Sequence, residues 1–272
     1  MTTEKTSLAT EKLMAVMQQA VLEAGQAIIR LYEAGCEVAL KSDASPVSEA
    51  DHIAEEIILK ALRAYLPDVP VIAEEEMAAG DSPVEIKERF FLVDPLDGTK
   101  EFVQRNGDFT VNIALIEDGF PVSGVVYAPV SARLYCGSPA GAWQYDMQPD
   151  ATAIETRLSV RACGMQKTAV ASRSHNTPET DAYLREQAIV SCISVGSSLK
   201  FCLLAAGQAD VYPRFSRTME WDTAAGDAVL RAAGGKTLTL DNQPLIYGKR
   251  NQQTDSDYAN PSFIAYGGAE LA

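Results

Sequence analysis

The order of two hydrophobic patterns limits the fold of this chain more than any other feature. Apolar and polar residues alternate over 110–116, 122–127, 133–136 and 142–145, with Gly119, Pro129 and Gly137 between or beside these runs. A period of two with such breaks predicts an antiparallel β meander. From about residue 157 the pattern changes to short strands that alternate with helices, which is typical of α/β folds.

Helical periodicity marks the segments before the meander. Residues 13–34 place Leu13, Met17 and Ile28 on one face, and Gly35 follows as a stop. A second helix is expected from Ser48, its predicted N-cap, to near Pro67, and a short strand at 71–72. The later pattern predicts strands at 169–172, 189–195, 209–212 and 236–240 and helices at 178–187, 197–206 and 223–233. The turn-like residues 148–150 predict a boundary near 148–157, which divides the chain into residues 1–152 and 153–272.

Composition excludes several classes of function. The 272 residues carry a net charge of −14, so binding to nucleic-acid polymers is not expected. No apolar run approaches the roughly 20 residues that cross a bilayer, and the polar N-terminus does not resemble a signal peptide. The five cysteines contain no C-x-x-C pair and are expected to be reduced thiols. These observations predict a cytoplasmic protein.

The segment Asp94-Pro95-Leu96-Asp97-Gly98-Thr99 is the strongest candidate for a site. It follows an apolar run, 90–93, that we interpret as a buried strand end. Proline moves the residue before it toward an extended conformation, and glycine lets the backbone approach a ligand closely. We expect a turn that presents two carboxylates, a carbonyl and a hydroxyl on one concave surface. Hard oxygen ligands of this kind suit Mg²⁺.

Two other acidic positions are candidate ligands. Glu74 opens a run of three acids after the predicted strand at 71–72. Such a run is usually solvated surface, but sites in α/β folds gather where strands end, so Glu74 is the expected ligand. If the strand continued, Glu75 would point to the opposite face. Asp222 opens the helix of Trp221-Asp222-Thr223-Ala224-Ala225-Gly226 and is either an N-cap or a metal ligand beside small residues.

Three further features have two interpretations each. Asp51 either supports the start of its helix or contributes to the site. The segment Gly196-Ser197-Ser198-Leu199-Lys200 is either an ordinary capped helix or an anion site at a helix N-terminus. Ser172 and His175 follow a predicted strand, where they form a polar loop or contact a second phosphate or a base.

These segments occur together in one family. Ile72-Ala73-Glu74-Glu75, the 94–99 segment and the 221–226 segment, in that order, resemble the inositol monophosphatase superfamily of lithium-sensitive, magnesium-dependent phosphatases. Within it, the chain resembles the 3'(2'),5'-bisphosphate nucleotidases of the CysQ type at 94–102, 105–116, 124–130, 172–175, 196–203 and 212–215. Ala73 departs from the Ser or Gly that the family often has, but it leaves Glu74 in register.

The resemblance implies a fold and a reaction. The fold is the layered αβαβα sandwich of the inositol monophosphatase and fructose-1,6-bisphosphatase type, with an N-terminal α+β half and a C-terminal α/β half. The reaction is removal of the 3'-phosphate from adenosine 3',5'-bisphosphate, a by-product of sulfur assimilation, and also from phosphoadenylyl sulfate. The implied partner is this small nucleotide, with no strong membrane anchor.

The resemblance also implies roles for particular residues. Glu74, Asp94 and the Leu96 carbonyl would hold one Mg²⁺, and Asp94, Asp97 and Asp222 a second. A third, looser ion would use Asp51 and Glu74. The catalytic residues would be Asp51, Thr99 and Glu74. The substrate-binding residues would be Glu74, Leu96, Asp97, Gly98, Thr99, Ser172, His175, Gly196, Lys200 and Asp222. Independently, carboxylates that converge without cations raise one another's pKa, which argues for bound metal.

Three alternatives stay open at this point. A phosphatase of the same superfamily that acts on inositol monophosphates or sugar phosphates would have the same metal site. A catalytically inactive protein that senses nucleotide or metal would be expected to have lost a metal-binding residue or Thr99. The candidate metal-binding residues and Thr99 are all present in this sequence. A magnesium-binding scaffold would not need Thr99 and Asp51 beside the ligands.

Overall fold

The computed structural model describes residues 2–35, 38–40, 46–81, 83, 85–86, 88–148, 150, 152–162, 164 and 166–268. For residues 2–7, 38–40 and 46–48 it describes the backbone alone. The predicted N-cap at Ser48 therefore lies outside the described side chains, as do Cys36 and Cys163. None of the described helices is both long and apolar enough to cross a membrane.

The predicted meander forms most of the larger sheet, which has seven strands. Its strands follow one another in chain order, and all neighbours are antiparallel except β3 and β4. They are β3 (Val71–Ala73), β4 (Arg89–Asp97), β5 (Thr110–Glu117), β6 (Phe120–Ala128), β7 (Arg133–Ser138), β8 (Gly141–Met147) and β9 (Ala153–Leu158).

The last strand of this sheet corrects the sequence analysis. The region near 148–157, where a boundary between two halves was predicted, contains β9, a strand that was not predicted and that pairs with β8 from Ala153 to Leu158. Five of its six side chains are exposed, so the strand lacks the buried alternation that marks its neighbours. The larger sheet thus continues to Leu158, and the division of the chain after residue 152 stays a prediction.

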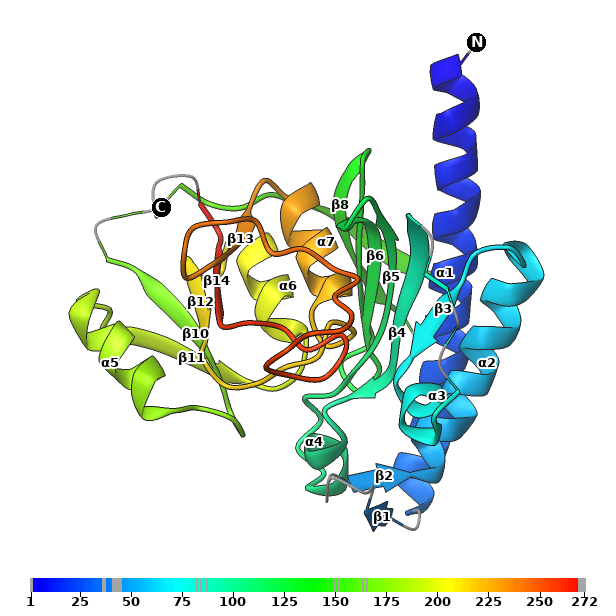
Figure 1. Cartoon of the computed structure of the whole chain (residues 1–272), viewed down its shortest axis with the longest axis horizontal. Helices are drawn as coiled ribbons and strands as arrows, with labels where there is room; N and C mark the ends of the chain where they lie inside the picture. Colours follow the sequence, from blue (N-terminus) through cyan, green and yellow to red (C-terminus); the bar gives the residue numbers. More distant parts are fainter. Residues whose placement is uncertain are drawn as a thin grey trace.

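Two helices cover one face of the larger sheet (Figure 1). They are α1 (Thr2–Ala34) and α2 (Glu49–Tyr65), which are connected through the short antiparallel pair β1 (Val38–Leu40) and β2 (Pro46–Ser48). The helix α1 begins at Thr2, well before the predicted start at Leu13, and its N-terminal end projects from the body of the molecule (Figure 1). Two short helices, α3 (Glu74–Ala79) and α4 (Thr99–Val103), follow β3 and β4.

The C-terminal part forms the smaller sheet of five strands, in the order β11-β10-β12-β14-β13. Its strands are β10 (Thr168–Ser172), β11 (Ser191–Val195), β12 (Val211–Arg214), β13 (Lys236–Thr239) and β14 (Phe263–Tyr266). The helices are α5 (Pro178–Glu186), α6 (Leu199–Ala205) and α7 (Ala224–Ala232). All were predicted within a few residues except β14, a wholly buried run of four residues without alternation.

The elements stack as the predicted αβαβα sandwich (Figure 1). The helices α6 and α7 lie between the two sheets, and α5 covers the outer face of the smaller one. Alternation along β4 serves both faces of the larger sheet: Phe91 and Val93 pack on α1 and α2, whereas Phe90 and Leu92 face α6 and α7. The core is therefore divided by the larger sheet.

Glycines let α7 lie unusually close to the larger sheet. A Cβ atom on Gly124 of β6 would lie 2.5 Å from the Ala225 carbonyl oxygen, and one on Gly137 of β7 would lie 2.5 Å from the Val229 Cα. Real Cβ atoms do not approach other atoms so closely, so these positions exclude larger residues. This contact sets the distance between the start of α7 and the end of β4.

Candidate active site

The segment 94–99 forms a bulged strand end that leads into a helix. Asp94 to Asp97 belong to β4, rather than to a free turn as the sequence suggested, and the pairing with β5 shifts between these two residues. Gly98 follows with φ of +97°, a left-handed conformation that glycine adopts without strain, and α4 begins at Thr99. The bulge and the glycine together place Asp94, Asp97 and Thr99 along one pocket of about 230 Å³.

Five carboxylates line this pocket. One of them, Glu101, accepts the hydroxyl of Ser174. The other four come from three parts of the chain, and we call them the acidic group: Glu74, Asp94, Asp97 and Asp222. Glu74 begins α3, so the predicted strand does not continue and Glu75 lies in the first turn of a helix. Oxygen atoms of Glu74, Asp94 and Asp222 all lie within 4.8 Å of one another. The sequence order alone does not bring these three together; the fold does.

Burial changes the acidity of this group. Burial, together with the nearby charges of Asp97 and Glu74, raises the pKa of Asp222 to about 7. Burial likewise raises the pKa of Asp97, an effect that the Lys200 ammonium partly offsets. Carboxylates held this close resist ionising together, and a divalent cation removes that repulsion. The donor set, all carboxylate oxygens with the Leu96 carbonyl nearby, therefore fits Mg²⁺.

An asparagine that the sequence analysis did not single out connects the two halves of the site. The Asn112 Nδ2 donates to Asp97 Oδ2 at 3.2 Å and to Ser198 Oγ at 3.0 Å. The Ser198 hydroxyl donates in turn to the backbone oxygen of Asp222 at 2.7 Å. Asn112 is a buried polar residue inside the apolar strand β5, and that interruption of the pattern was the available signal.

Thr99 and Asp51 form a second feature of the site. The Thr99 Oγ1 lies 3.2 Å from Asp51 Oδ1 and 3.3 Å from the Leu96 carbonyl oxygen, either of which accepts its hydrogen. Asp51 is buried on α2, and it lies behind Thr99 rather than in the wall of the pocket. A hydroxyl backed by a buried carboxylate can orient a water molecule and pass on its proton.

Glu55, one turn after Asp51 on α2, supports the position of Glu74. Its carboxylate accepts the backbone N–H groups of Glu75 and Glu76 at 2.8 and 2.9 Å. Free N–H groups at a helix start favour a negative charge. Burial nonetheless raises the pKa of Glu55 to about 7. This carboxylate thus holds the first turn of α3, where Glu74 lies.

Four cations line the same pocket, and we call them the basic group: Lys100, Lys200, Arg214 and Arg217. Arg214 is almost fully buried and donates to the carbonyl oxygens of Ser216 and Arg217 at 3.1 and 3.0 Å. Lys200 is also buried, and its Nζ lies 5.4 Å from the centre of the Tyr212 ring. Burial lowers the pKa of Lys200 to about 8, so it remains mostly protonated at neutral pH.

His175 lies beside the basic group as a neutral side chain. Its Nε2 is 3.3 Å from Lys100 Nζ, and its backbone N–H donates to Ser172 Oγ at 3.1 Å. Burial, together with the charges of Arg214 and Lys100, lowers the pKa of His175 to about 4. At neutral pH this imidazole therefore accepts or donates hydrogen bonds without adding charge.

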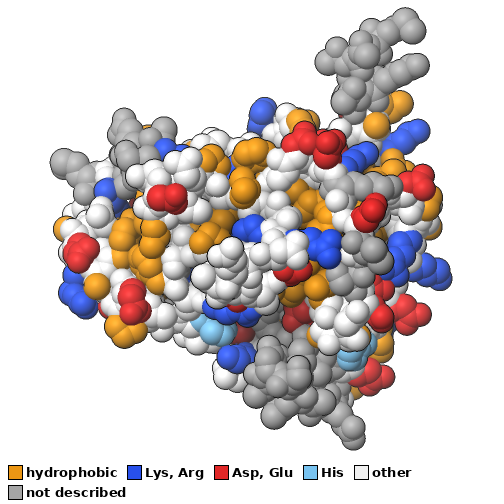
Figure 2. All heavy atoms as spheres, in the orientation of Figure 1, with side chains coloured by type: hydrophobic (Ala, Val, Ile, Leu, Met, Phe, Trp, Pro, Cys, Tyr) orange, Lys and Arg blue, Asp and Glu red, His pale blue; other side chains and the backbone are white. Residues whose placement is uncertain are grey.

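Basic residues are dispersed elsewhere on the face that Figure 2 shows. There the Lys and Arg side chains of the described residues lie in separate small groups between acidic and uncharged surface. This distribution agrees with the net charge of −14.

A family model decides the identification. The model of the inositol monophosphatase family matches residues 9–266 of the chain. The chain belongs to the inositol monophosphatase family. Among curated relatives, the 3'(2'),5'-bisphosphate nucleotidase CysQ of Salmonella typhimurium is 44% identical over 90% of this chain and 96% of its own length. The CysQ nucleotidase of Buchnera aphidicola is 40% identical over 93% of each chain.

Solved structures agree with this membership. The crystal structure of CysQ from Bacteroides thetaiotaomicron, a bacterial member of the inositol monophosphatase family, superposes with a TM-score of 0.77. It is 37% identical in sequence and covers 95% of this chain and 98% of that one. The predicted fold class and family are thereby confirmed.

Within this family fold, most of the predicted site residues line one pocket. They are Glu74, Asp94, Leu96, Asp97, Gly98, Thr99, Ser172, His175, Lys200 and Asp222. Two of the predicted residues, Asp51 and Gly196, are not among the residues that line the described pocket. The Gly196 N–H donates to Asp108 Oδ2 at 3.1 Å, and α6 begins only at Leu199, whereas Ser197 and Lys200 of the same segment line the pocket.

Asp222 does not act as the N-cap that the sequence left open. The N-cap of α7 is Thr223, and Asp222 Oδ2 instead accepts the backbone N–H of Met219 at 2.9 Å. The sequence analysis assigned no role to Arg214, Arg217 and Lys100. Their only sequence signal was position, since Arg214 ends β12 and Lys100 follows Thr99.

Proposed function

We propose that this protein is a magnesium-dependent phosphatase that removes the 3'-phosphate of adenosine 3',5'-bisphosphate and yields AMP and phosphate. Phosphoadenylyl sulfate is a second substrate of the same chemistry. The observation that carries the proposal is the pairing of an acidic group and a basic group in one pocket. The names of the CysQ relatives, at 40–44% identity over most of the chain, support the nucleotide.

The acidic group would hold the metal. Glu74, Asp94 and the Leu96 carbonyl suit one Mg²⁺, and Asp94, Asp97 and Asp222 suit a second, with Asp51 and Glu74 available to a looser third ion. Bound Mg²⁺ neutralises phosphoryl oxygens and lowers the pKa of bound water. In support, the oxygens of Glu74, Asp94 and Asp222 already lie within 4.8 Å of one another.

The chain's own residues would orient the attack of water on phosphorus. The Thr99 hydroxyl would hold the water, and Asp51, 3.2 Å from Thr99, would accept its proton. The bond from phosphorus to the ribose 3'-oxygen breaks as the bond from phosphorus to water forms, and the 3'-oxygen takes up a proton. The Gly98 N–H at the start of α4 would bind the scissile phosphate.

The basic group explains a preference for a substrate with two phosphates. A monophosphate needs only the acidic group and its cations. A second phosphate would bind Arg214 and Lys200, which are buried and therefore interact more strongly with an anion than exposed lysines do. Ser172 and His175 would contact the remaining nucleoside. We place this reaction in the cytoplasm.

The test is phosphate release from adenosine 3',5'-bisphosphate and from inositol 1-phosphate, side by side. We expect release that depends on Mg²⁺, is abolished by EDTA, is inhibited by Li⁺ and strongly favours the bisphosphate. Preference for inositol phosphate would keep the metal chemistry but overturn the proposed substrate. Failure to release phosphate from either would contradict the proposal as a whole.

A further inference from the structure

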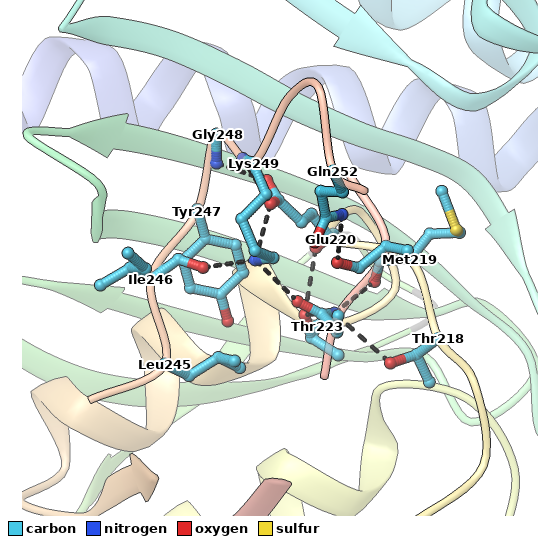
Figure 3. Close-up of polar contacts among 12 residues, drawn as sticks. Thr218, Met219, Glu220, Thr223, Leu245, Ile246, Tyr247, Gly248, Lys249 and Gln252 are labelled. Atoms are coloured by element: carbon cyan, nitrogen blue, oxygen red, sulfur yellow. Dashed lines mark hydrogen bonds and ion pairs between the residues drawn. The ribbon is translucent and has the colours of Figure 1, made fainter. Parts of the chain in front are cut away.

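A fully buried carboxylate lies two residues before Asp222. Glu220 accepts the backbone N–H groups of Gly248 and Lys249 at 2.6 and 2.9 Å. The Lys249 ammonium lies 2.7 Å from Glu220 Oε1, and its side chain is mostly buried as well (Figure 3). The carboxylate thus has three donors from one segment of the C-terminal loop.

The same loop contacts the turn that carries Asp222 at a second point. The Asn260 Nδ2 donates to the Met219 carbonyl oxygen at 2.8 Å and to Thr223 Oγ1 at 3.0 Å. Its Oδ1 accepts from Lys249 Nζ at 3.2 Å, so the amide and the ammonium belong to one network. We call Glu220, Lys249 and Asn260 the Glu220 cluster.

Backbone hydrogen bonds join the two segments as well. The Glu220 N–H donates to the Tyr258 carbonyl oxygen at 2.8 Å, and the Asn260 N–H donates to the Thr218 carbonyl oxygen at 2.9 Å. The residues from Thr218 to Thr223 are therefore held at both ends by a loop that lies outside the pocket.

This turn decides where the Asp222 carboxylate points. The Asp222 Oδ2 accepts the backbone N–H of Met219. The carbonyl oxygen of Met219 in turn accepts the Asn260 side-chain amide. Asp222 also shares the pocket with the other members of the acidic group, whereas Glu220, Lys249 and Asn260 are not among the residues lining the described pocket. A shift of the turn would move one metal ligand relative to the others.

The presence of a charged pair, Glu220 and Lys249, at this buried position also needs an explanation. Burying a carboxylate is unfavourable, and a buried ion pair is often no more stabilising than apolar residues of similar volume. The Glu220–Lys249 pair does, however, favour one arrangement of the loop relative to the turn, because any other arrangement would leave a buried charge without its partner. Residues that hold a metal ligand from behind commonly change metal affinity when they are replaced.

We propose that the Glu220 cluster consists of positioning residues that hold the Asp222 carboxylate in place for metal binding. The inference rests on the proposed metal site. It assigns a role in Mg²⁺ affinity to a loop, 248–260, that contributes no side chain to the described pocket.

The test compares Lys249→Met with a matched control, Arg231→Met. Each variant breaks a pair in which the carboxylate is fully buried, since Arg231 pairs with Asp227 at 2.8 Å on α7 and does not contact the 218–223 turn in any described hydrogen bond. Mg²⁺ binding is measured by calorimetry on protein without substrate. We expect Lys249→Met to weaken Mg²⁺ binding about 10-fold and Arg231→Met to leave it within about twofold, even where thermal unfolding shows equal destabilisation.

Two further variants keep the test decisive if Lys249→Met does not fold. Glu220→Gln keeps the side-chain size and one acceptor oxygen but removes the charge, and it should weaken Mg²⁺ binding as Lys249→Met does. Lys249→Arg keeps the cation and should restore most of the affinity. The double variant Glu220→Gln with Lys249→Met should be no weaker than either single variant, because both act through one pair.

Two kinds of result would contradict the account, and they can be told apart. Wild-type Mg²⁺ affinity in folded Glu220→Gln, or equal losses in Lys249→Met and Arg231→Met, would overturn this inference alone. No Mg²⁺ binding by the wild-type protein would instead overturn the proposed function on which it rests.

Discussion

Each acid of the site is held by a different local device. Glu74 starts a helix whose first turn is capped by the buried Glu55. Asp94 lies in a bulged strand. Asp222 is held by a backbone N–H of its own turn. None of these devices includes a bound ion, and together they hold the acids near one another.

Replacing one acid should separate catalysis from folding. Asp94→Asn and Asp97→Asn should each lower kcat by about 10³-fold or more, because several kcal/mol of charge stabilisation in the transition state is lost. Without Mg²⁺ the variants should be at least as stable as the wild type, since repulsion in the acidic group falls. The measurements are phosphate release at saturating Mg²⁺ and thermal unfolding in EDTA. Near-normal turnover in either variant would refute the metal assignment.

Lys200 should matter for the nucleotide and not for phosphate chemistry. Lys200→Ala should raise KM for adenosine 3',5'-bisphosphate about 10-fold, which corresponds to about 1.4 kcal/mol, and change KM for a small phosphate ester much less. Lys236→Ala is a matched control, because Lys236 also lies near an aromatic ring, that of Tyr266, but does not line the described pocket. Equal effects of Lys200→Ala on both substrates would contradict its role.

The sequence predicted the acidic group and Lys200, but not the other three members of the basic group. The acids occur in short segments with a proline, a glycine or small neighbours, and each such segment has a local physical meaning. Arg214 follows Pro213, and Lys100 follows Gly98 and Thr99, but neither position predicts an anion site by itself, and only the arrangement of β12 and α4 brings these two cations to one pocket. Asn112 was detectable in principle, because a polar residue interrupts an apolar strand.

At the scale of elements, the closeness of α7 to the larger sheet positions Asp222. The helix begins two residues after Asp222, and it packs over Gly124 and Gly137. Side chains larger than hydrogen at these two positions would push α7 away from β6 and β7. The site therefore depends on a contact between elements that carry no catalytic residue at that point.

Gly137→Ala should destabilise the protein by about 1–3 kcal/mol through overpacking, because the new methyl group would lie 2.5 Å from the Val229 Cα. Gly164→Ala is the control, since a Cβ there would meet no atom within 4 Å. The free energy of unfolding in urea measures both, and the control should change it by less than about 0.5 kcal/mol. A Gly137→Ala variant as stable as the control would show that α7 adjusts freely.

Sequence patterns predicted elements where one face is buried and failed where that contrast is missing. The meander strands alternate and were predicted, whereas β9 is exposed along most of its length and β14 is buried throughout. The early start of α1 was missed because its first turns lack the apolar stripe that begins at Leu13.

At the scale of the whole molecule, the site joins the two halves of the chain. The larger sheet contributes Asp94 and Asp97, the turn before α7 contributes Asp222, and β12 and the loop after it contribute Arg214 and Arg217. Charge in this shared pocket is therefore linked to the stability of the complete fold. Cations that bind there should stabilise the protein by mass action.

Stability without Mg²⁺ should fall as pH rises. The folded-state pKa of Asp222, about 7, exceeds its ordinary value of 3.8, so the folded protein keeps a proton that the unfolded chain has released. The protonated Asp222 therefore contributes to the free energy of unfolding, and this contribution is complete at low pH and is lost as pH rises through 7. Between pH 5.5 and 8 we expect a loss of about 2 kcal/mol, or about 4–8 °C in Tm. Thermal unfolding in EDTA measures the loss, and saturating Mg²⁺ should remove most of it. A Tm in EDTA that rises over this range, after correction with Asp222→Asn, would contradict the account.

The central claim is that one pocket acts on one phosphate through its acidic group and holds another through its basic group. The most direct test compares kcat/KM of the wild-type protein for adenosine 3',5'-bisphosphate and adenosine 3'-monophosphate, with identification of the nucleotide product. Loss of the second phosphate removes charged hydrogen bonds worth about 2–3 kcal/mol, so kcat/KM should fall about 100-fold, and the bisphosphate should yield the 5'-monophosphate. Equal kcat/KM for the two substrates, or release of the 5'-phosphate, would contradict the claim.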